Sequence, residues 1–325
     1  MTQNKELRQL ENSLEIVGTL KSIDLEEKES KKGNWYVKGN LIVSCNIDDK
    51  IHDQRISVFI MKTSGLYKGI RTVMDEWKAS DDVGKELAHR VRVNGELTLN
   101  QYINKNDKLV QFNEIKGVFF SRLKEEENDV NDPKYVKDKA LASVEAVVEG
   151  FDNVLDSDKL PTGDFSVKAF TVAWGSTVVD LHNVIVKESL AEAFMDLYQP
   201  GNTGRLTLQL NNYVEIVDQP EEQPVAQTHG FGSSEVVEST VVDRYVNNIE
   251  VIGGDMPFLG SKEYTPEEIE LATKTSQLAI QSLSAAPSTP QVPDTNTGFG
   301  AGTTTPDVSS QMPTGMSSDD EMPDF

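Results

Sequence analysis

The chain has 325 residues, a formal net charge of −22 at pH 7 and one cysteine, Cys45. One cysteine excludes an internal disulfide bond and any zinc site that needs several cysteines. The sequence has no signal peptide and no apolar run long enough to span a membrane, so we expect a soluble, cytoplasmic protein.

Charge is distributed unevenly along the chain. Residues 1–124 hold 21 basic and 18 acidic residues, whereas residues 125–284 hold 10 basic and 29 acidic ones. Residues 285–325 hold 6 acidic residues and no basic residue. A surface that binds phosphate groups is therefore expected in the first third of the chain.

Two kinds of periodicity organise residues 1–124. Alternation of polar and apolar residues predicts strands, and apolar residues three or four apart predict a helix. Three strands, a helix and two more strands are the element order of the OB-fold, a five-stranded barrel. We therefore predict a first OB-fold over residues 1–124. The expected strands are 14–23, 35–47, 55–62, 90–102 and 108–123, the helix is 66–78, and the charged segment 26–34 is expected to be a loop or hairpin.

An acidic linker at 125–139 separates this unit from a second copy of the same pattern. Such internal similarity indicates two copies of one structural unit. We therefore predict a second OB-fold over 140–258, with a long, mobile loop at 220–234 between its last two strands. The matching pairs of segments are Asn34–Gly39 with Asp164–Ala169, Leu97–Tyr102 with Leu206–Tyr213, and Phe112–Ile115 with Val246–Ile249.

A helix and a tail complete the predicted architecture. Thr265 suits the N-cap of a helix, Pro266 suits its first position and Glu268 completes a capping box, so we expect a helix within 259–284. Residues 285–325 are mostly polar residues, Pro and Gly, which cannot bury enough apolar surface to offset the entropy of ordering. The predicted fold class is thus mainly all-β, with two tandem OB-fold five-stranded barrels, a C-terminal helix and a disordered acidic tail.

The first barrel carries the candidate binding residues. OB barrels hold single nucleic-acid strands across the outer face of strands 2 and 3, between the loops that join strands 1–2 and 4–5. Rings on that face stack on bases, and Lys or Arg side chains neutralise phosphates. Strand alternation places Tyr36 and Phe59 on the outer face. The predicted residues that bind single-stranded DNA are Lys31, Lys32, Tyr36, Lys38, Arg55, Phe59, Tyr102, Lys105 and Lys108.

Other aromatic residues are expected to play different parts. Strand alternation places Trp35 in the core, and the helical spacing of 66–78 places Trp77 there. In the second barrel, Ser166 stands where the first has Tyr36, while Phe170 and Trp174 fall on the outward face, which leaves weak stacking or a protein contact open. We expect the first barrel to do most of the DNA binding, and the second to extend the site or mediate dimerisation.

The last seven residues form a candidate partner-binding tip. An acidic run before a terminal aromatic ring suits a partner pocket with an apolar floor and a basic rim. This end resembles the acidic tip of bacterial and phage single-stranded DNA-binding proteins, in which the final Pro and Phe are adjacent, whereas Asp324 separates them here. The tip residues are Asp319, Asp320, Glu321, Met322, Pro323, Asp324 and Phe325.

The resemblance implies a non-sequence-specific single-stranded DNA-binding protein of replication, recombination or repair. It implies that the tip recruits polymerase, primase or helicase. Typical bacterial members have one barrel per chain and assemble as tetramers, so two barrels point to a phage or plasmid version acting in the host cytoplasm. Homo-oligomerisation stays open.

Two alternatives remain: a tandem-barrel adaptor that binds proteins without DNA, and a mediator of strand annealing in recombination. The sequence has no Walker-type loop, no Gly-x-Ser-x-Gly motif and no metal-ligand spacing. We therefore expect no enzyme activity, no cofactor, no metal and no membrane partner.

Overall fold

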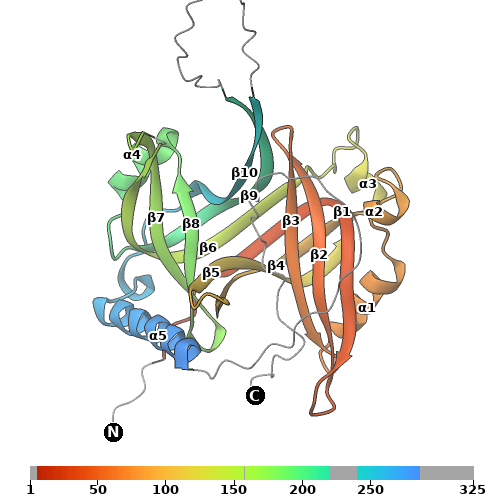
Figure 1. Ribbon diagram of the computed structural model, residues 1–325, viewed down its shortest axis with the longest axis horizontal. Coiled ribbons are helices and arrows are strands. Elements are labelled where there is room, and N and C mark those ends of the chain that lie inside the picture. The colour runs from red at the N-terminus through yellow and green to blue at the C-terminus, as the bar shows by residue number, and fades with distance from the viewer. Residues whose placement is uncertain (1–5, 157, 220–239, 286–325) are drawn as a thin grey trace, which may run out of the picture.

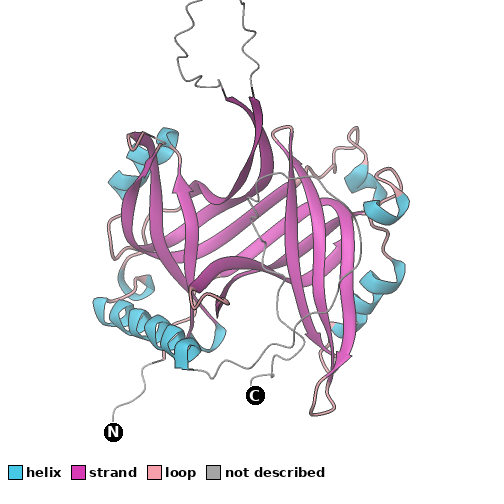
Figure 2. Ribbon diagram, viewed as in Figure 1, coloured by secondary structure: helices cyan, strands magenta, loops and turns pink. Residues whose placement is uncertain are grey.

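The computed structural model describes residues 6–156, 158–219 and 240–285. Ten β-strands within these ranges form two barrels that share one continuous hydrogen-bonded sheet (Figure 1, Figure 2). The tip residues Asp319–Phe325 and the predicted loop at 220–234 lie outside the described residues. Within the described ranges, no helix has both the length and the apolar character needed to cross a membrane.

The first barrel comprises β1 (Asn12–Glu29), β2 (Trp35–Ile47), β3 (Lys50–Met61), α1 (Tyr67–Glu76), α2 (Ser80–Val83), β4 (Arg90–Ile103) and β5 (Leu109–Arg122). β1 pairs antiparallel with both β2 and β4, and a short parallel pairing joins β3 to β5. The closed order β1-β2-β3-β5-β4-β1 is that of an OB-fold. Ile70 and Val73 of α1 pack into the core, as the helical spacing predicts.

The second barrel repeats this topology. It comprises β6 (Lys139–Leu155), β7 (Pro161–Ala173), β8 (Thr177–Val186), α4 (Glu188–Leu197), β9 (Thr203–Gln219) and β10 (Thr240–Gly254). β6 pairs with β7 and β9, and β8 pairs in parallel with β10, so this barrel closes in the same order. The predicted fold class, mainly all-β with two five-stranded barrels and a C-terminal helix, is confirmed.

Several strands are longer than the sequence pattern predicts. β1 runs to Glu29, through part of the segment expected to be a loop, and β3 begins at Lys50. Glu29 is still paired with Trp35 of β2, and only the turn from Ser30 to Asn34 leaves the ladder. The β1 extension, residues 24–29, is at least partly exposed throughout, and the β3 extension buries the polar residues His52 and Gln54. The composition of both extensions therefore resembles that of a loop.

The two barrels are joined directly, strand to strand. Residues 12–17 of β1 pair antiparallel with residues 139–144 of β6. Ion pairs cross this seam: Lys139 Nζ lies 2.6 Å from Glu15 Oε2, and Arg205 contacts both Glu11 and Glu145. The segment between the barrels includes α3 (Glu125–Asn128) and packs on β4, because Arg90 Nη2 lies 2.5 Å from Asp138 Oδ1. The seam and these ion pairs restrict how the barrels can move relative to each other.

The C-terminal helix α5 (Pro266–Ala285) and the N-terminal segment cover one face of the second barrel. The capping box is present: Thr265 Oγ1 accepts from Glu268 N at 3.3 Å, and Glu268 Oε2 accepts from Thr265 N at 2.9 Å. Phe170 points outward from β7 but is only 1% exposed, because Tyr264 and Leu10 pack over it. Stacking of a base on Phe170, one of the two possibilities that the sequence left open, is therefore excluded, since elements distant in sequence cover this face.

Candidate nucleic-acid interface

The outer face of β2 and β3 carries a row of alternating side chains. Val37, Leu41, Ile56 and Val58 point into the barrel and are buried. The intervening residues face outward, and the antiparallel register makes them neighbours across the two strands. The outward cross-strand pairs are Tyr36 with Met61, Lys38 with Phe59, Asn40 with Ser57, and Ile42 with Arg55.

Two aromatic rings of this row contact each other. The ring centroids of Tyr36 and Phe59 lie 5.2 Å apart, with planes tilted by 36°. The Phe59 side chain remains 46% exposed although it belongs to a strand of a closed barrel. Exposed rings fixed against a sheet are suitable platforms for stacking of nucleobases.

Trp35 adds a third ring that the sequence pattern misplaces. It is 41% exposed, so its predicted place in the core is wrong, whereas Trp77 packs against the core as expected. Trp35 lies two residues before Val37, so strand alternation gives both side chains the same inward direction. Trp35 is, however, the first residue of β2 and lies beyond the end of the barrel interior. Lys62 Nζ lies 5.2 Å from the centroid of its ring. Strand alternation alone could not have revealed this exposure, because the exposure depends on where the barrel ends.

Most predicted cations of the interface have no ion-pair partner within the part of the chain that the structure describes. Lys38 and Arg55 make no side-chain hydrogen bond or ion pair with another described residue, and neither do the three exposed lysines of the flanking turns, Lys31, Lys105 and Lys108. Other basic residues of this barrel are paired: Lys62 with Glu27 and Lys116 with Glu96. The unpaired cations are therefore available to an anionic ligand without first breaking an internal ion pair.

The turn between β1 and β2 lies beside the aromatic rings, whereas the turn between β4 and β5 lies apart from them. Lys31 and Lys32 are exposed in the turn between β1 and β2, next to the strand end that carries Tyr36. Tyr102 and the turn lysines Lys105 and Lys108 belong to the hairpin of β4 and β5, which reaches toward the second barrel (Figure 1).

Asn113 fixes the hairpin of β4 and β5 against β8 of the second barrel. Its Nδ2 donates to the backbone oxygen of Asp180 at 2.8 Å, and its Oδ1 accepts from the backbone amide of His182 at 2.6 Å. The structure therefore brings Tyr36, Lys38, Arg55 and Phe59 onto one face, and leaves Tyr102, Lys105 and Lys108 on a separate projection.

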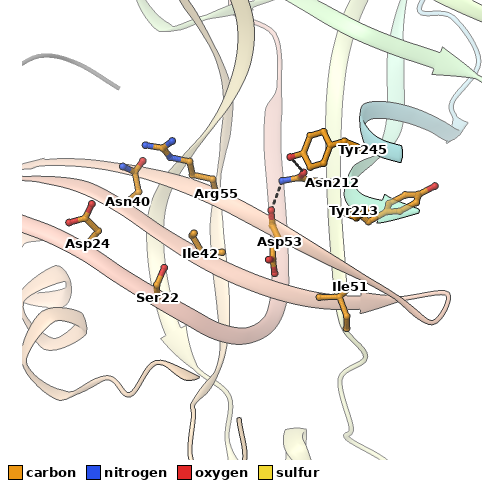
Figure 3. Close-up of a pocket in the computed structure, with 11 residues that line it drawn as sticks. Ser22, Asp24, Asn40, Ile42, Ile51, Asp53, Arg55, Asn212, Tyr213 and Tyr245 are labelled. Atoms are coloured by element: carbon orange, nitrogen blue, oxygen red, sulfur yellow. Dashed lines mark hydrogen bonds between the residues drawn. The ribbon is translucent and has the colours of Figure 1, made fainter. Parts of the chain in front are cut away.

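A pocket of about 400 Å³ continues this face toward the second barrel (Figure 3). Arg55 and Asn40 lie side by side on one wall, and Tyr245 and Asn212 form part of the opposite wall. Sequence reasoning missed the second wall, because no local pattern in β9 or β10 indicates which strand of the other barrel will face it. The pocket is lined by Ser22, Asp24, Asn40, Ile42, Ile51, Asp53, Arg55, Asn212, Tyr213, Val214 and Tyr245.

Titratable groups with shifted pKa values lie around this face. Lys21 lies 2.5 Å from Asp53, and this hydrogen bond raises the pKa of the lysine. Burial lowers the pKa of His52, whose ring lies 4.7 Å from that of Tyr213. Burial also raises the pKa of the Cys45 thiol, so this cysteine is an inert core residue. The described residues contain no cluster of three or more His, Cys, Asp or Glu that could hold a metal ion.

The family model described as YorF matches residues 11–286. This chain belongs to the YorF family. A search of curated proteins found no match for this YorF chain.

Solved structures similar to this YorF chain include wild-type single-stranded DNA binding protein from Thermus aquaticus, at 12% identity and a TM-score of 0.44, covering 80% of this chain and 99% of the other. A deletion mutant of the Thermus aquaticus protein has 13% identity and a TM-score of 0.43, covering 80% and 98%. Mitochondrial single-stranded DNA binding protein from S. cerevisiae has 14% identity and a TM-score of 0.24, covering 36% and 98%. Likeness at this level carries no conclusion about what the present chain binds.

Proposed function

We propose that this chain binds single-stranded DNA without sequence preference, mainly through the outer face of β2 and β3. The observation that carries the proposal is the contact between half-buried Tyr36 and exposed Phe59. Beside these rings lie the cations Lys38 and Arg55, which have no ion-pair partner among the described residues. Aromatic rings can stack on any base, and binding of Lys or Arg to phosphates is favourable because it releases counterions from the DNA. This combination needs a flexible strand with accessible bases, which a duplex does not present.

The second barrel has a different surface. Its β7 and β8 strands correspond in topology to β2 and β3, but α5 and the N-terminal segment cover the outward Phe170. Lys168, at the repeat position of Lys38, lies 2.7 Å from Asp152 and is already paired. These differences support the proposal that the first barrel, within residues 1–124, does most of the binding.

The proposed cellular role is coating of single strands in DNA replication, recombination or repair, in a phage-type protein with two barrels per chain. The acidic tip, from Asp319 to Phe325, would recruit replication proteins such as polymerase, primase or helicase. Its carboxylates and terminal ring match a partner pocket with a basic rim and an apolar floor. This part of the proposal rests on the sequence, because the tip lies outside the described residues.

The test is a titration of the full chain with oligo-dT, monitored through tryptophan fluorescence and carried out at about 50 mM and at about 200 mM salt. We expect quenching, because Trp35 lies at the end of the aromatic row, and an affinity that falls as salt rises. Trp35→Phe should keep most of the affinity and lose most of the quenching, which places the ligand at this face. No binding at low salt, even after removal of the acidic tip, would refute the proposal.

The adaptor without DNA binding is favoured by one observation. Trp174 is 76% exposed and Leu259 is 85% exposed, both in the strongly acidic part of the chain. Tryptophan is enriched in protein–protein interfaces relative to the rest of protein surfaces. The same titration separates the two functions, because the adaptor predicts neither quenching nor a shift of labelled oligo-dT at any salt concentration.

A further inference from the structure

The pocket between the barrels has one wall from each barrel. β2 and β3 contribute Asn40, Ile42, Ile51 and Arg55, while β9 and β10 contribute Asn212, Val214 and Tyr245 (Figure 3). Arg55 lies four residues before Phe59 on β3, about 13 Å away at the rise of an extended strand. The outward row that carries Tyr36 and Phe59 therefore leads directly into this pocket.

The wall from the second barrel holds its aromatic ring in a defined position. The Tyr245 hydroxyl donates to Asn212 Oδ1, and Asn212 Nδ2 in turn donates to the backbone oxygen of Asp53 on β3. This chain of hydrogen bonds ties the ring to the first barrel, although the Tyr245 side chain is still 44% exposed. A ring fixed before binding loses little entropy when a base stacks on it.

Apolar side chains continue the surface around that ring. Ile51 is 48% exposed and Val214 is 55% exposed, so both present apolar surface to solvent inside the pocket. The volume of about 400 Å³ lies within the range of about 300–1,000 Å³ typical of ligand pockets. These walls suit a flat ligand of modest size with apolar faces, such as one nucleobase.

Polar groups at the pocket have unused hydrogen-bonding capacity. The Arg55 guanidinium and the Asn40 side-chain amide make no hydrogen bond with another described residue. The Asp53 carboxylate is already satisfied by Lys21 and Ser44. Asp24 also lines the pocket, and its negative charge disfavours a phosphate there. The Asn40 amide suits the edge of a base, and the Arg55 guanidinium remains for a phosphate of the same strand.

We infer that this pocket binds an unpaired nucleobase of the same strand that lies on β2 and β3, and that Tyr245 of the second barrel stacks on it. The inference rests on the proposed function, because it extends the same bound strand. It gives the second barrel a route to DNA through β9 and β10, although its β7–β8 face is covered by its own chain. The bound strand then crosses from one barrel to the other.

The experiment measures fluorescence anisotropy of labelled oligo-dT with the full chain and its Tyr245→Ala, Tyr245→Phe and Trp174→Ala variants. A short oligonucleotide of about five nucleotides and a long one of about twenty are compared, since one OB-fold takes about 4–16 nucleotides. We expect Tyr245→Ala to weaken binding of the long strand about five-fold or more, and binding of the short strand much less. Tyr245→Phe keeps the ring but loses the hydrogen bond to Asn212, so its affinity should lie between those of Tyr245→Ala and the wild type. Trp174→Ala removes another exposed ring of the second barrel and should bind as wild type.

Crosslinking tests the same inference without changing the protein. A long oligo-dT containing 5-iodouracil should crosslink to Tyr245 or to a neighbouring pocket residue upon irradiation, as peptide mapping would show. Unchanged affinity of Tyr245→Ala for the long strand, or crosslinks confined to the Tyr36–Phe59 region, would overturn the inference. A loss in Tyr245→Phe as large as in Tyr245→Ala would overturn the stacking. Absence of any binding by the wild-type chain would instead refute the proposed function itself.

Discussion

Gln54 of the first barrel donates a hydrogen bond from Nε2 to the backbone oxygen of Leu210 in the second barrel, at 2.7 Å. Gln54 is 2% exposed and Leu210 is 5% exposed, so the bond is shielded from water. Close by, Lys50 Nζ lies 3.0 Å from Glu215 Oε1. The barrels are therefore joined at β3 and β9 as well as along the β1–β6 seam, which gives the pocket between them two fixed walls.

We expect Gln54→Leu to lower the free energy of unfolding by about 1–3 kcal/mol, because the buried Leu210 carbonyl loses its side-chain donor. Urea denaturation followed by circular dichroism measures the change. Gln281→Leu on the exposed surface of α5 is the matched control and should shift stability by less than about 0.5 kcal/mol. Equal stability of the two variants would show that this bond between the barrels contributes nothing.

Phe59→Ala should weaken binding of oligo-dT by about 1–3 kcal/mol, because it removes the more exposed ring of the Tyr36 pair. Phe119→Ala is the control, since Phe119 is also an exposed phenylalanine of the first barrel, 58% exposed on β5. Anisotropy titrations of both variants check this prediction. A larger loss for Phe119→Ala would move the interface away from β2 and β3.

Lys38→Ala should reduce the slope of log affinity against log salt by about one, because one unpaired cation no longer displaces a counterion. Lys116→Ala should reduce the slope less, since Lys116 Nζ already lies 3.1 Å from Glu96 Oε1. The measurement is a titration repeated across a salt series. Identical slopes for Lys38→Ala and the wild-type chain would remove Lys38 from the phosphate contacts.

The stability of the protein should fall in mild acid through His52. Burial lowers the pKa of this imidazole, and a hydrogen bond to the Leu210 backbone opposes it with a smaller effect. The charge of Lys50 lowers the pKa further, and Asp48 has the smallest, raising effect. A histidine with a lowered pKa in the folded state stabilises the fold above its unfolded pKa of about 6.5, and this stability is lost as pH falls toward the folded value. The contribution of one such group changes by at most about 1.4 kcal/mol per pH unit.

His52→Asn keeps an acceptor for the amide of Asn212 but cannot take up this proton. The difference in unfolding free energy between about pH 7.5 and about pH 5.5 should therefore be smaller in the variant. Part of the dependence should remain, because burial also lowers the pKa of His89. Identical pH dependence in the variant and the wild-type chain would exclude His52 as a source.

Deletion of residues 316–325 should tighten DNA binding at low salt. This segment carries acidic residues and no basic ones, so it competes with phosphates for the cations of the first barrel. The gain should disappear at high salt because the interaction is screened. A full-length variant with Asp319, Asp320, Glu321 and Asp324 changed to amides should behave like the deletion. An unchanged affinity across the salt series would count against this competition.

Local sequence pattern was sufficient for the outward face of the first barrel. A closed barrel interior excludes polar groups, so alternation along β2 and β3 correctly assigned Tyr36, Lys38 and Phe59 to the outside. The same alternation failed for Trp35, because it carries no information on where the barrel ends. It placed Phe170 outward correctly but could not show that Tyr264 covers this ring from nearly a hundred residues away in the chain.

The sequence by itself determined the two barrels, the capped helix at Thr265 and the row of rings and cations, because each depends on periodicity or spacing between nearby residues. Only the tertiary structure decided that β1 pairs with β6, that α5 closes the β7–β8 face and that Tyr245 lies across a pocket from Arg55. Those relationships depend on which surfaces of distant segments bury each other. That choice is made by the whole chain during packing, and no short stretch of residues records it.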